Sequence, residues 1–180
     1  MSRFLDKRLS SLKAYIPGEQ PKLGEFIKLN TNEFPYSPAN DVAESAKNAV
    51  GNMNLYCDLT CKALKERFKD VFGYGGKNVI FTNGSDDALY LCFLTFCGED
   101  CGAAFADITY GFYKVYCHLY KIPYRLVPLN TDMALIVDDY IAPCSGIVIA
   151  NPNAPTGRAI GINDIRRLLT LHQNRVVIVD

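Results

Sequence analysis

The sequence lacks an excess of either charge. It has 19 Lys and Arg residues against 19 Asp and Glu residues, with two His, so its formal net charge is zero. Proteins that bind nucleic acids or anionic membranes usually carry a basic excess, so the balance argues against both partners. Hydrophobic residues make up 49% and charged residues 21%, which is a globular composition. The length of 180 residues suits one domain with a core.

The sequence also lacks long apolar runs. No stretch approaches the roughly 20 apolar residues that a membrane-spanning helix needs, and the first eight residues contain no apolar region like that of a signal peptide. We therefore expect a cytoplasmic protein.

Metal-binding cysteine patterns are missing as well. The seven cysteines form no C-x-x-C pair, and no histidine pattern accompanies the two pairs that have three residues between them. A zinc site would need such clusters, so we predict no metal site and expect reduced, mostly buried thiols. The cysteines are Cys57, Cys61, Cys92, Cys97, Cys101, Cys117 and Cys144.

Strand patterns alternate with helix patterns from residue 78 onward, which favours an α/β fold with a largely parallel sheet. The runs 147–150 and 176–179 are continuously apolar, as expected for strands covered on both faces. We expect strands at 78–82, 101–106, 124–129, 146–150 and 175–180. We expect helices at 41–50, 60–72, from the 83–87 loop to about 96, from the Thr109-Tyr110-Gly111 loop to about 120, and at 163–172, with a helical turn at 138–141.

Residues 1–38 are predicted to form an arm, because prolines interrupt them repeatedly, twice within 35–38. Residues 39–180 would form the layered domain. The chain stops at Asp180, directly after a buried strand, so we expect it to be a fragment of a longer protein.

Four loops follow strands at the edge where α/β sheets bind ligands. The loop 83–87 precedes a helix and could hold a phosphate, or Ser85 or Asp86 could simply cap that helix. Tyr110 could lie flat against a planar heterocycle or pack on its neighbours.

The other two loops carry amides and a carboxylate. The loop 151–157 contains Asn151, Asn153, two prolines and a glycine, which suits either a rigid turn or a polar site. Asp180 could be a solvated strand end, or it could pair with a cation such as a protonated pyridine nitrogen. No Walker sequence or G-x-G-x-x-G is present.

In order and spacing, these segments resemble the fold-type I aminotransferases that use pyridoxal 5'-phosphate (PLP), and most of all the histidinol-phosphate aminotransferase family. The matching segments are 28–36 (KLNTNEFPY), 54–58 (NLYCD), 83–88 (NGSDDA), 109–113 (TYGFY), 151–157 (NPNAPTG) and 176–180 (VVIVD). The resemblance implies a three-layer sandwich with a largely parallel sheet, of which this chain holds the amino-terminal part of the large domain.

The resemblance also implies roles for individual residues. Gly84, Ser85 and Asp86 would hold the cofactor phosphate, Tyr110 would stack on the ring, and Asp180 would pair with the ring nitrogen. Ala154 stands where the family has an asparagine that contacts the ring hydroxyl, so Asn153 or Asn151 would take over that contact.

Further roles concern the partner subunit and the substrate. Tyr56 would reach the phosphate in a neighbouring subunit, which implies a homodimer with shared sites, although Cys57 replaces the usual proline after it. Asn32 and Phe34 would lie near the substrate.

The implied activity is transamination between histidinol phosphate and 2-oxoglutarate, in histidine biosynthesis. The alternatives are another class I or II aminotransferase, an enzyme like threonine-phosphate decarboxylase, or a non-catalytic binding module. The lysine that binds the cofactor and the arginine that binds the substrate carboxylate lie beyond the aspartate in this family. Neither is in this chain, so we expect residues 1–180 by themselves to be inactive.

Overall fold

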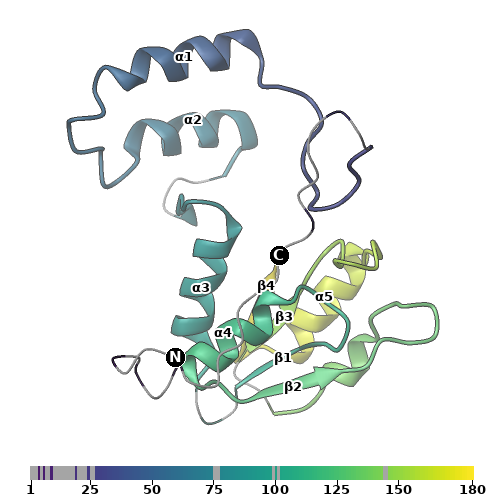
Figure 1. The fold of residues 1–180 in the computed structure, drawn as a ribbon. Helices are drawn as coiled ribbons and strands as arrows, with labels where there is room; N and C mark the ends of the chain where they lie inside the picture. The colour runs from purple at the N-terminus through teal and green to yellow at the C-terminus, as the bar shows by residue number, and fades with distance from the viewer. Residues whose placement is uncertain are drawn as a thin grey trace. The chain divides into compact units, whose positions relative to one another are not determined.

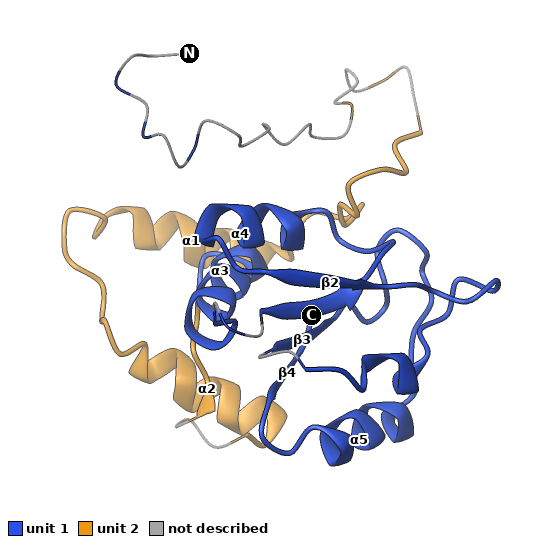
Figure 2. Cartoon of the chain, turned by 90° about the horizontal axis from the view of Figure 1, so that it is seen from below, with its two compact units in different colours: residues 1–15, 82–180 blue, residues 16–81 orange. Residues whose placement is uncertain are grey.

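The computed structural model describes residues 4, 6, 9, 19, 24, 27–74, 78–98, 100, 102–143 and 146–180. The chain divides into two compact units, shown in two colours in Figure 2. We call Met1–Tyr15 with Thr82–Asp180 the sheet unit, and Ile16–Phe81 the helical unit. Each is described by itself. The predicted boundary at residue 38 stays a prediction.

The helical unit contains α1 (Asn40–Val50) and α2 (Lys62–Phe72). Asp58 fixes the start of α2, because its Oδ2 accepts a hydrogen bond from the Lys62 backbone N–H at 2.8 Å. Its Oδ1 accepts from the Thr60 hydroxyl at 2.7 Å and the Thr60 N–H at 2.9 Å. These hydrogen bonds lower the pKa of Asp58, as donors to a carboxylate do.

The sheet unit holds four parallel strands in the order β2-β1-β3-β4, drawn in Figure 1. Helices connect the strands, as parallel pairing requires. The strands are β1 (Ala103–Ala106), β2 (Tyr124–Val127), β3 (Gly146–Ile149) and β4 (Val176–Val179). The helices are α3 (Ser85–Phe96), α4 (Phe112–Tyr120), the 3-10 helix η3 (Val137–Tyr140) and α5 (Ile162–Leu171).

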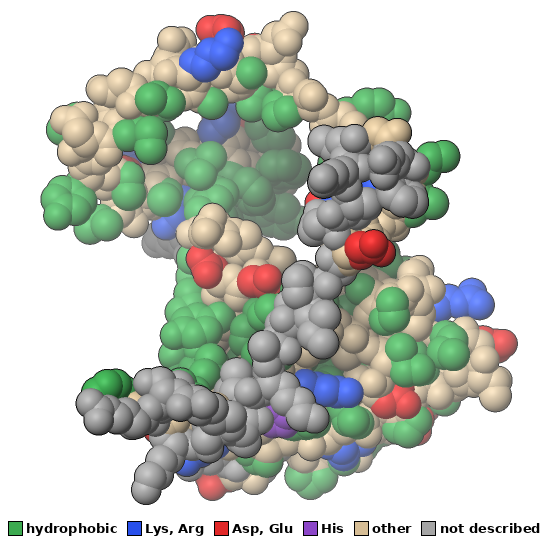
Figure 3. All heavy atoms as spheres, viewed as in Figure 1, with side chains coloured by type: hydrophobic (Ala, Val, Ile, Leu, Met, Phe, Trp, Pro, Cys, Tyr) green, Lys and Arg blue, Asp and Glu red, His purple; other side chains and the backbone are tan. Residues whose placement is uncertain are grey.

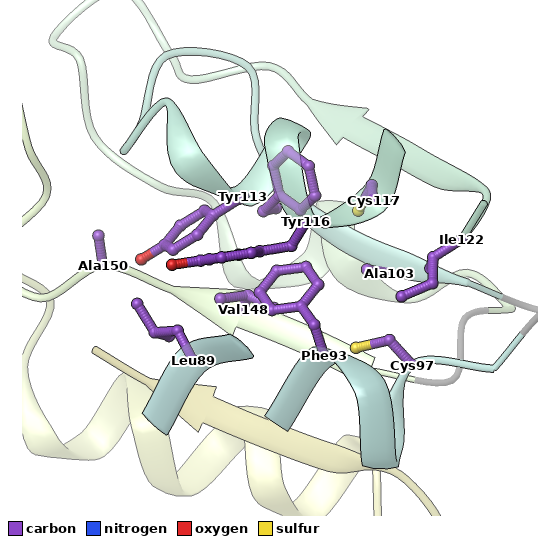
Figure 4. Packing of buried hydrophobic residues seen from close by; sticks show 11 residues of the cluster. Leu89, Phe93, Cys97, Ala103, Tyr113, Tyr116, Cys117, Ile122, Val148 and Ala150 are labelled. Carbon is purple, nitrogen blue, oxygen red and sulfur yellow. The ribbon is translucent and has the colours of Figure 1, made fainter. Parts of the chain in front are cut away.

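The two faces of the sheet bury different sets of side chains, because successive strand residues point to opposite faces. Phe105 and Val148 lie on the face covered by α3 and α4, together with Leu89, Phe93, Tyr113, Tyr116, Cys117 and others, shown in Figure 4. Ile147 and Ile149 face the opposite cluster, which includes Val137, Tyr140 and Leu168 from η3 and α5. Helices on both faces confirm the three-layer α/β prediction.

One predicted strand is wrong. Residues 79–82 form no strand and pair with none in the described part of the chain, and Ile80 is 82% exposed. A β-prone sequence becomes a strand only when a neighbour supplies the hydrogen bonds of its backbone. The other observed strands and helices lie within two or three residues of the predicted bounds, and Cys101 lies outside the described residues.

The expectation of mostly buried thiols is also wrong for the described cysteines. Cys97 and Cys117 are buried, Cys61 and Cys92 are half-buried, and Cys57 is exposed; Cys101 and Cys144 lie outside the described residues. Burial raises the pKa of the Cys117 thiol to about 12, so that thiol stays protonated and unreactive near neutral pH.

Charged side chains of both signs are interspersed over the face drawn in Figure 3. This distribution agrees with the zero net charge. Among the described helices, none has the length and apolar character needed to cross a bilayer.

His172 follows α5 and is only 4% exposed. Its Nδ1 lies 3.4 Å from the Nη1 of Arg175, while its Nε2 has no hydrogen-bond partner among the described residues. Burial, and then the positive charge of Arg175, lower the pKa of His172 below its ordinary value of 6.5. The folded state therefore holds this ring neutral in conditions where an unfolded chain would protonate it.

We predict that the unfolding temperature falls by a few degrees between pH 7 and pH 5. The unfolded state takes up a proton on His172 as the pH drops through about 6.5, while the folded state resists, so stability is lost toward acid. The measurement is calorimetry of wild type and His172→Asn, whose pH dependence should be flatter. His118→Asn is the matched control, because this histidine lies more exposed on α4. Equal slopes for wild type and His172→Asn would contradict the prediction.

Candidate functional site

The carboxyl ends of β1, β3 and β4 lie at one edge of the sheet, because all three strands are parallel. The backbone joins two of the following loops there: the Asp180 N–H donates to the Ile149 carbonyl at 2.9 Å, and the Asn151 N–H donates to the Asp180 carbonyl at 2.8 Å. The start of the loop after β3 and the residue that follows β4 are thus fixed side by side by main-chain hydrogen bonds.

The Asp180 side chain is exposed at this edge and has one buried partner. The Tyr113 hydroxyl, from α4, donates to Asp180 Oδ2 at 2.6 Å. Burial, and then this contact with the carboxylate, raise the pKa of Tyr113 well above its usual range. Tyr113 is therefore a neutral hydrogen-bond donor at any physiological pH.

Asp86, in the first turn of α3, is a second carboxylate that tyrosines approach. The Tyr110 hydroxyl lies 3.1 Å from Asp86 Oδ1, and the Tyr116 hydroxyl donates to the same oxygen at 3.0 Å. Burial, followed by the hydrogen bond to Asp86, raises the pKa of Tyr116 well above its usual range. These contacts join the loop after β1 to the start of α3.

The N-terminus of α3 is suited to binding an anion. Its N-cap residue is Gly84, at φ +83°, which has no side chain to satisfy the first N–H groups. Ser85 and Asp86 lie inside the helix, so the alternative that one of them is the N-cap is wrong. A twelve-residue helix has a positive dipole end here, and added phosphate oxygens would find unpaired backbone donors.

Asn153 organises the loop after β3. Its Nδ2 donates to the Ile108 carbonyl at 2.9 Å and to the Thr156 hydroxyl at 3.0 Å. Its Oδ1 accepts from the Thr109 hydroxyl at 2.8 Å. The Asn153 amide therefore ties the loop after β3 to the loop after β1.

The Asn151 side chain stays within its own loop: its Oδ1 accepts from the Ile160 N–H at 3.0 Å. A contact of Asn153 or Asn151 with a ring hydroxyl remains a prediction.

The structure thus brings six predicted residues into the sheet unit, on three loops and the first turn of α3. They are Gly84, Ser85, Asp86, Tyr110, Asn153 and Asp180. Tyr56, Asn32 and Phe34 belong to the helical unit. There Tyr56 is fully exposed and Phe34 is 80% exposed, and their predicted roles stay predictions.

Sequence reasoning missed the tyrosines that hold the two carboxylates, Tyr113 and Tyr116, and the two threonines bonded to Asn153. A signal was present, because Tyr113 and Tyr116 lie three residues apart and so share one face of α4. Nothing in that spacing says which carboxylate each hydroxyl meets.

The sequence profile of the family described as "Aminotransferase class I and II" matches residues 24–180. Histidinol-phosphate aminotransferase of Acetobacter pasteurianus is 47% identical over 181 aligned residues, covering 100% of this chain and 51% of that protein. Histidinol-phosphate aminotransferase 2 of Gluconobacter oxydans (strain 621H) is 43% identical with the same coverage. The chain spans about half the length of the curated relatives it matches.

A solved structure shares the fold. Histidinol-phosphate aminotransferase from Sinorhizobium meliloti, in complex with pyridoxal-5'-phosphate, superposes with a TM-score of 0.75 at 18% identity. The match covers 83% of this chain and 42% of that one.

Proposed function

We propose a function from the premise that the match over residues 24–180 establishes: the chain belongs to the aminotransferase class I and II family. It is the amino-terminal half of a PLP-dependent aminotransferase, with residues 1–38 as an arm and 39–180 as part of the large, cofactor-binding domain. The enzyme transfers the amino group of histidinol phosphate to 2-oxoglutarate, a reaction of histidine biosynthesis in the cytoplasm.

The residues at the carboxyl ends of the strands fit PLP. The first turn of α3, with Gly84 as its N-cap, offers backbone N–H groups to a phosphate. The exposed Asp180 carboxylate offers a negative charge to a protonated ring nitrogen. Bound PLP supplies a cationic ring that takes up the electron pair released at the substrate's α-carbon.

One observation carries the proposal: hydrogen bonds link all four loops of the site within the sheet unit. Tyr110 meets Asp86, Tyr113 meets Asp180, and Thr109 meets Asn153. Donors for a phosphate, an aromatic ring and a carboxylate partner for the ring nitrogen are thus provided on one framework. Catalytic sites need such preorganised groups.

The amino donor is proposed from the relatives, since those at 47% and 43% identity act, by their names, on histidinol phosphate. We also propose a homodimer in which Tyr56 binds the cofactor phosphate of the partner subunit. The full exposure of Tyr56 is compatible with such a role. Sedimentation of the complete protein tests the dimer: a monomer at micromolar concentration would overturn it.

The experiment that tests the function is an assay of the complete enzyme with PLP, 2-oxoglutarate and a panel of amino donors. We expect glutamate to form fastest with histidinol phosphate. Threonine phosphate belongs in the panel, with carbon dioxide release measured, because it tests the decarboxylase alternative. Cofactor binding without turnover of any donor would favour a non-catalytic module.

A further inference from the structure

We propose that Tyr113 is a positioning residue for Asp180: its hydroxyl holds Oδ2 and thereby sets the orientation in which the other oxygen, Oδ1, meets the cofactor's ring nitrogen. This inference rests on the proposed function, because it assigns Tyr113 a task in the PLP site. It adds a residue of α4 that does not itself touch the cofactor.

The geometry makes the contact rigid. Tyr113 has no exposed surface, and its hydroxyl donates to Asp180 Oδ2 at 2.6 Å, a short distance typical of a bond to a charged acceptor. Its ring is stacked on Phe93 at 5.9 Å and meets the edge of Phe105 at 5.6 Å. A ring enclosed in this way cannot swing aside, so the phenol is fixed by packing and in turn fixes the carboxylate.

The pairing of tyrosines with carboxylates is selective. Tyr113 and Tyr116 lie one turn apart on α4, and Figure 4 shows their hydroxyls at the same end of the core cluster. Yet the Tyr116 hydroxyl donates to Asp86 and that of Tyr113 to Asp180. The helix therefore holds Asp86 and Asp180 separately, and Asp180 has a donor of its own.

The chemistry requires such a donor. A carboxylate with no donor on either oxygen rotates about its side-chain bonds, and its charge meets a ring nitrogen only part of the time. A neutral donor on one oxygen removes that freedom without cancelling the charge. Burial and the carboxylate keep Tyr113 neutral by raising its pKa, so the donor persists across the working pH range.

The test uses the complete holoenzyme loaded with PLP carrying ¹⁵N at the ring nitrogen. In wild type we expect the ¹⁵N chemical shift of a protonated nitrogen. In Tyr113→Phe, which keeps the ring and removes only the hydroxyl, we expect a smaller protonated fraction and about tenfold weaker PLP binding. Tyr140→Phe is the matched control, because it removes a buried hydroxyl that has no partner among the described residues; its ¹⁵N signal should match wild type.

A double-mutant cycle separates positioning from general destabilisation. In an Asp180→Ala background, Tyr113→Phe should no longer change the affinity for PLP, since the group it positions is gone. If Tyr113→Phe does not fold, 3-fluorotyrosine at position 113 keeps the shape and alters only the hydroxyl's acidity, and it must still move the ¹⁵N signal.

The outcomes are distinct. A wild-type ¹⁵N signal in folded Tyr113→Phe, an undiminished effect in the Asp180→Ala background, or an unmoved signal with 3-fluorotyrosine would each overturn the inference alone. A wild-type protein that binds no PLP would overturn the proposed function, and the inference with it.

Discussion

Replacing Asp180 by alanine in the complete enzyme should abolish transamination, with a fall in turnover of at least about 10³-fold, and leave the α/β fold intact. The loss is expected because the charge that keeps the ring nitrogen protonated disappears, and removal of one preorganised charge partner has effects of this order. The backbone at this position does not depend on the side chain, because its N–H and carbonyl are both paired within the sheet edge.

Asp180→Ala should lower the free energy of unfolding only slightly. Removal of the Asp180 carboxylate takes the acceptor from the buried Tyr113 hydroxyl. An unsatisfied buried hydroxyl costs about 1–3 kcal/mol. Turnover with histidinol phosphate and thermal unfolding, measured side by side, separate the two effects.

Asp180→Asn is the matched control. It keeps an oxygen that can accept from Tyr113 but carries no charge, so it should be stable and still nearly inactive. Near-normal turnover in either variant would show that the carboxylate is not the partner of the ring nitrogen.

The second large effect concerns stability: Gly102→Ala should prevent folding or cost more than about 4 kcal/mol, in the range of the most damaging substitutions. Gly102 directly precedes β1 with φ +62°, and a Cβ there would lie 1.7 Å from the Pro123 carbonyl oxygen. Its carbonyl accepts a hydrogen bond from the Gly146 N–H of β3 at 3.1 Å. This bond ties the backbone of Gly102 to the neighbouring strand, so it cannot move away from Pro123.

Gly111→Ala is the control for this prediction. Gly111 has φ −64° at the start of α4, and an added Cβ would meet nothing within 4 Å. Its stability should change by less than about 1 kcal/mol. Chemical denaturation of the two variants and wild type measures both values, and a Gly102→Ala protein as stable as Gly111→Ala would refute the steric argument.

Much of the sheet unit could be predicted from the sequence, because its signals are local. The apolar runs that became β3 and β4 are typical of strands covered on both faces, and both are parallel strands of the sheet. A helix from the loop 83–87 to about residue 96 was expected, and α3 ends at the expected residue. Loops at the strand ends then followed from the topology, because parallel strands end at one edge.

What could not be predicted depends on contacts between distant residues. The segment 78–82 looks like a strand, but a strand needs a partner, and local sequence does not say whether one is present. No role was predicted for the tyrosines of α4, although Tyr113 lies in the matching segment 109–113. Their choice of Asp86 or Asp180, 30 and 67 positions away, is fixed only when the helix packs on the sheet.

The strand order also bears on how this chain behaves in solution. The strand β4 comes last in the order β2-β1-β3-β4, so one row of its backbone N–H and carbonyl groups has no strand beside it within the described sheet. Its residues, Val176–Val179, are only partly buried, whereas those of β3 are fully buried. An apolar edge with no lysine or proline to interrupt it is a template for a strand from another molecule. When residues 1–180 are produced by themselves, this edge is therefore where self-association into larger aggregates would begin, and a lysine in place of Val179, which is 44% exposed, is the change that would blunt it.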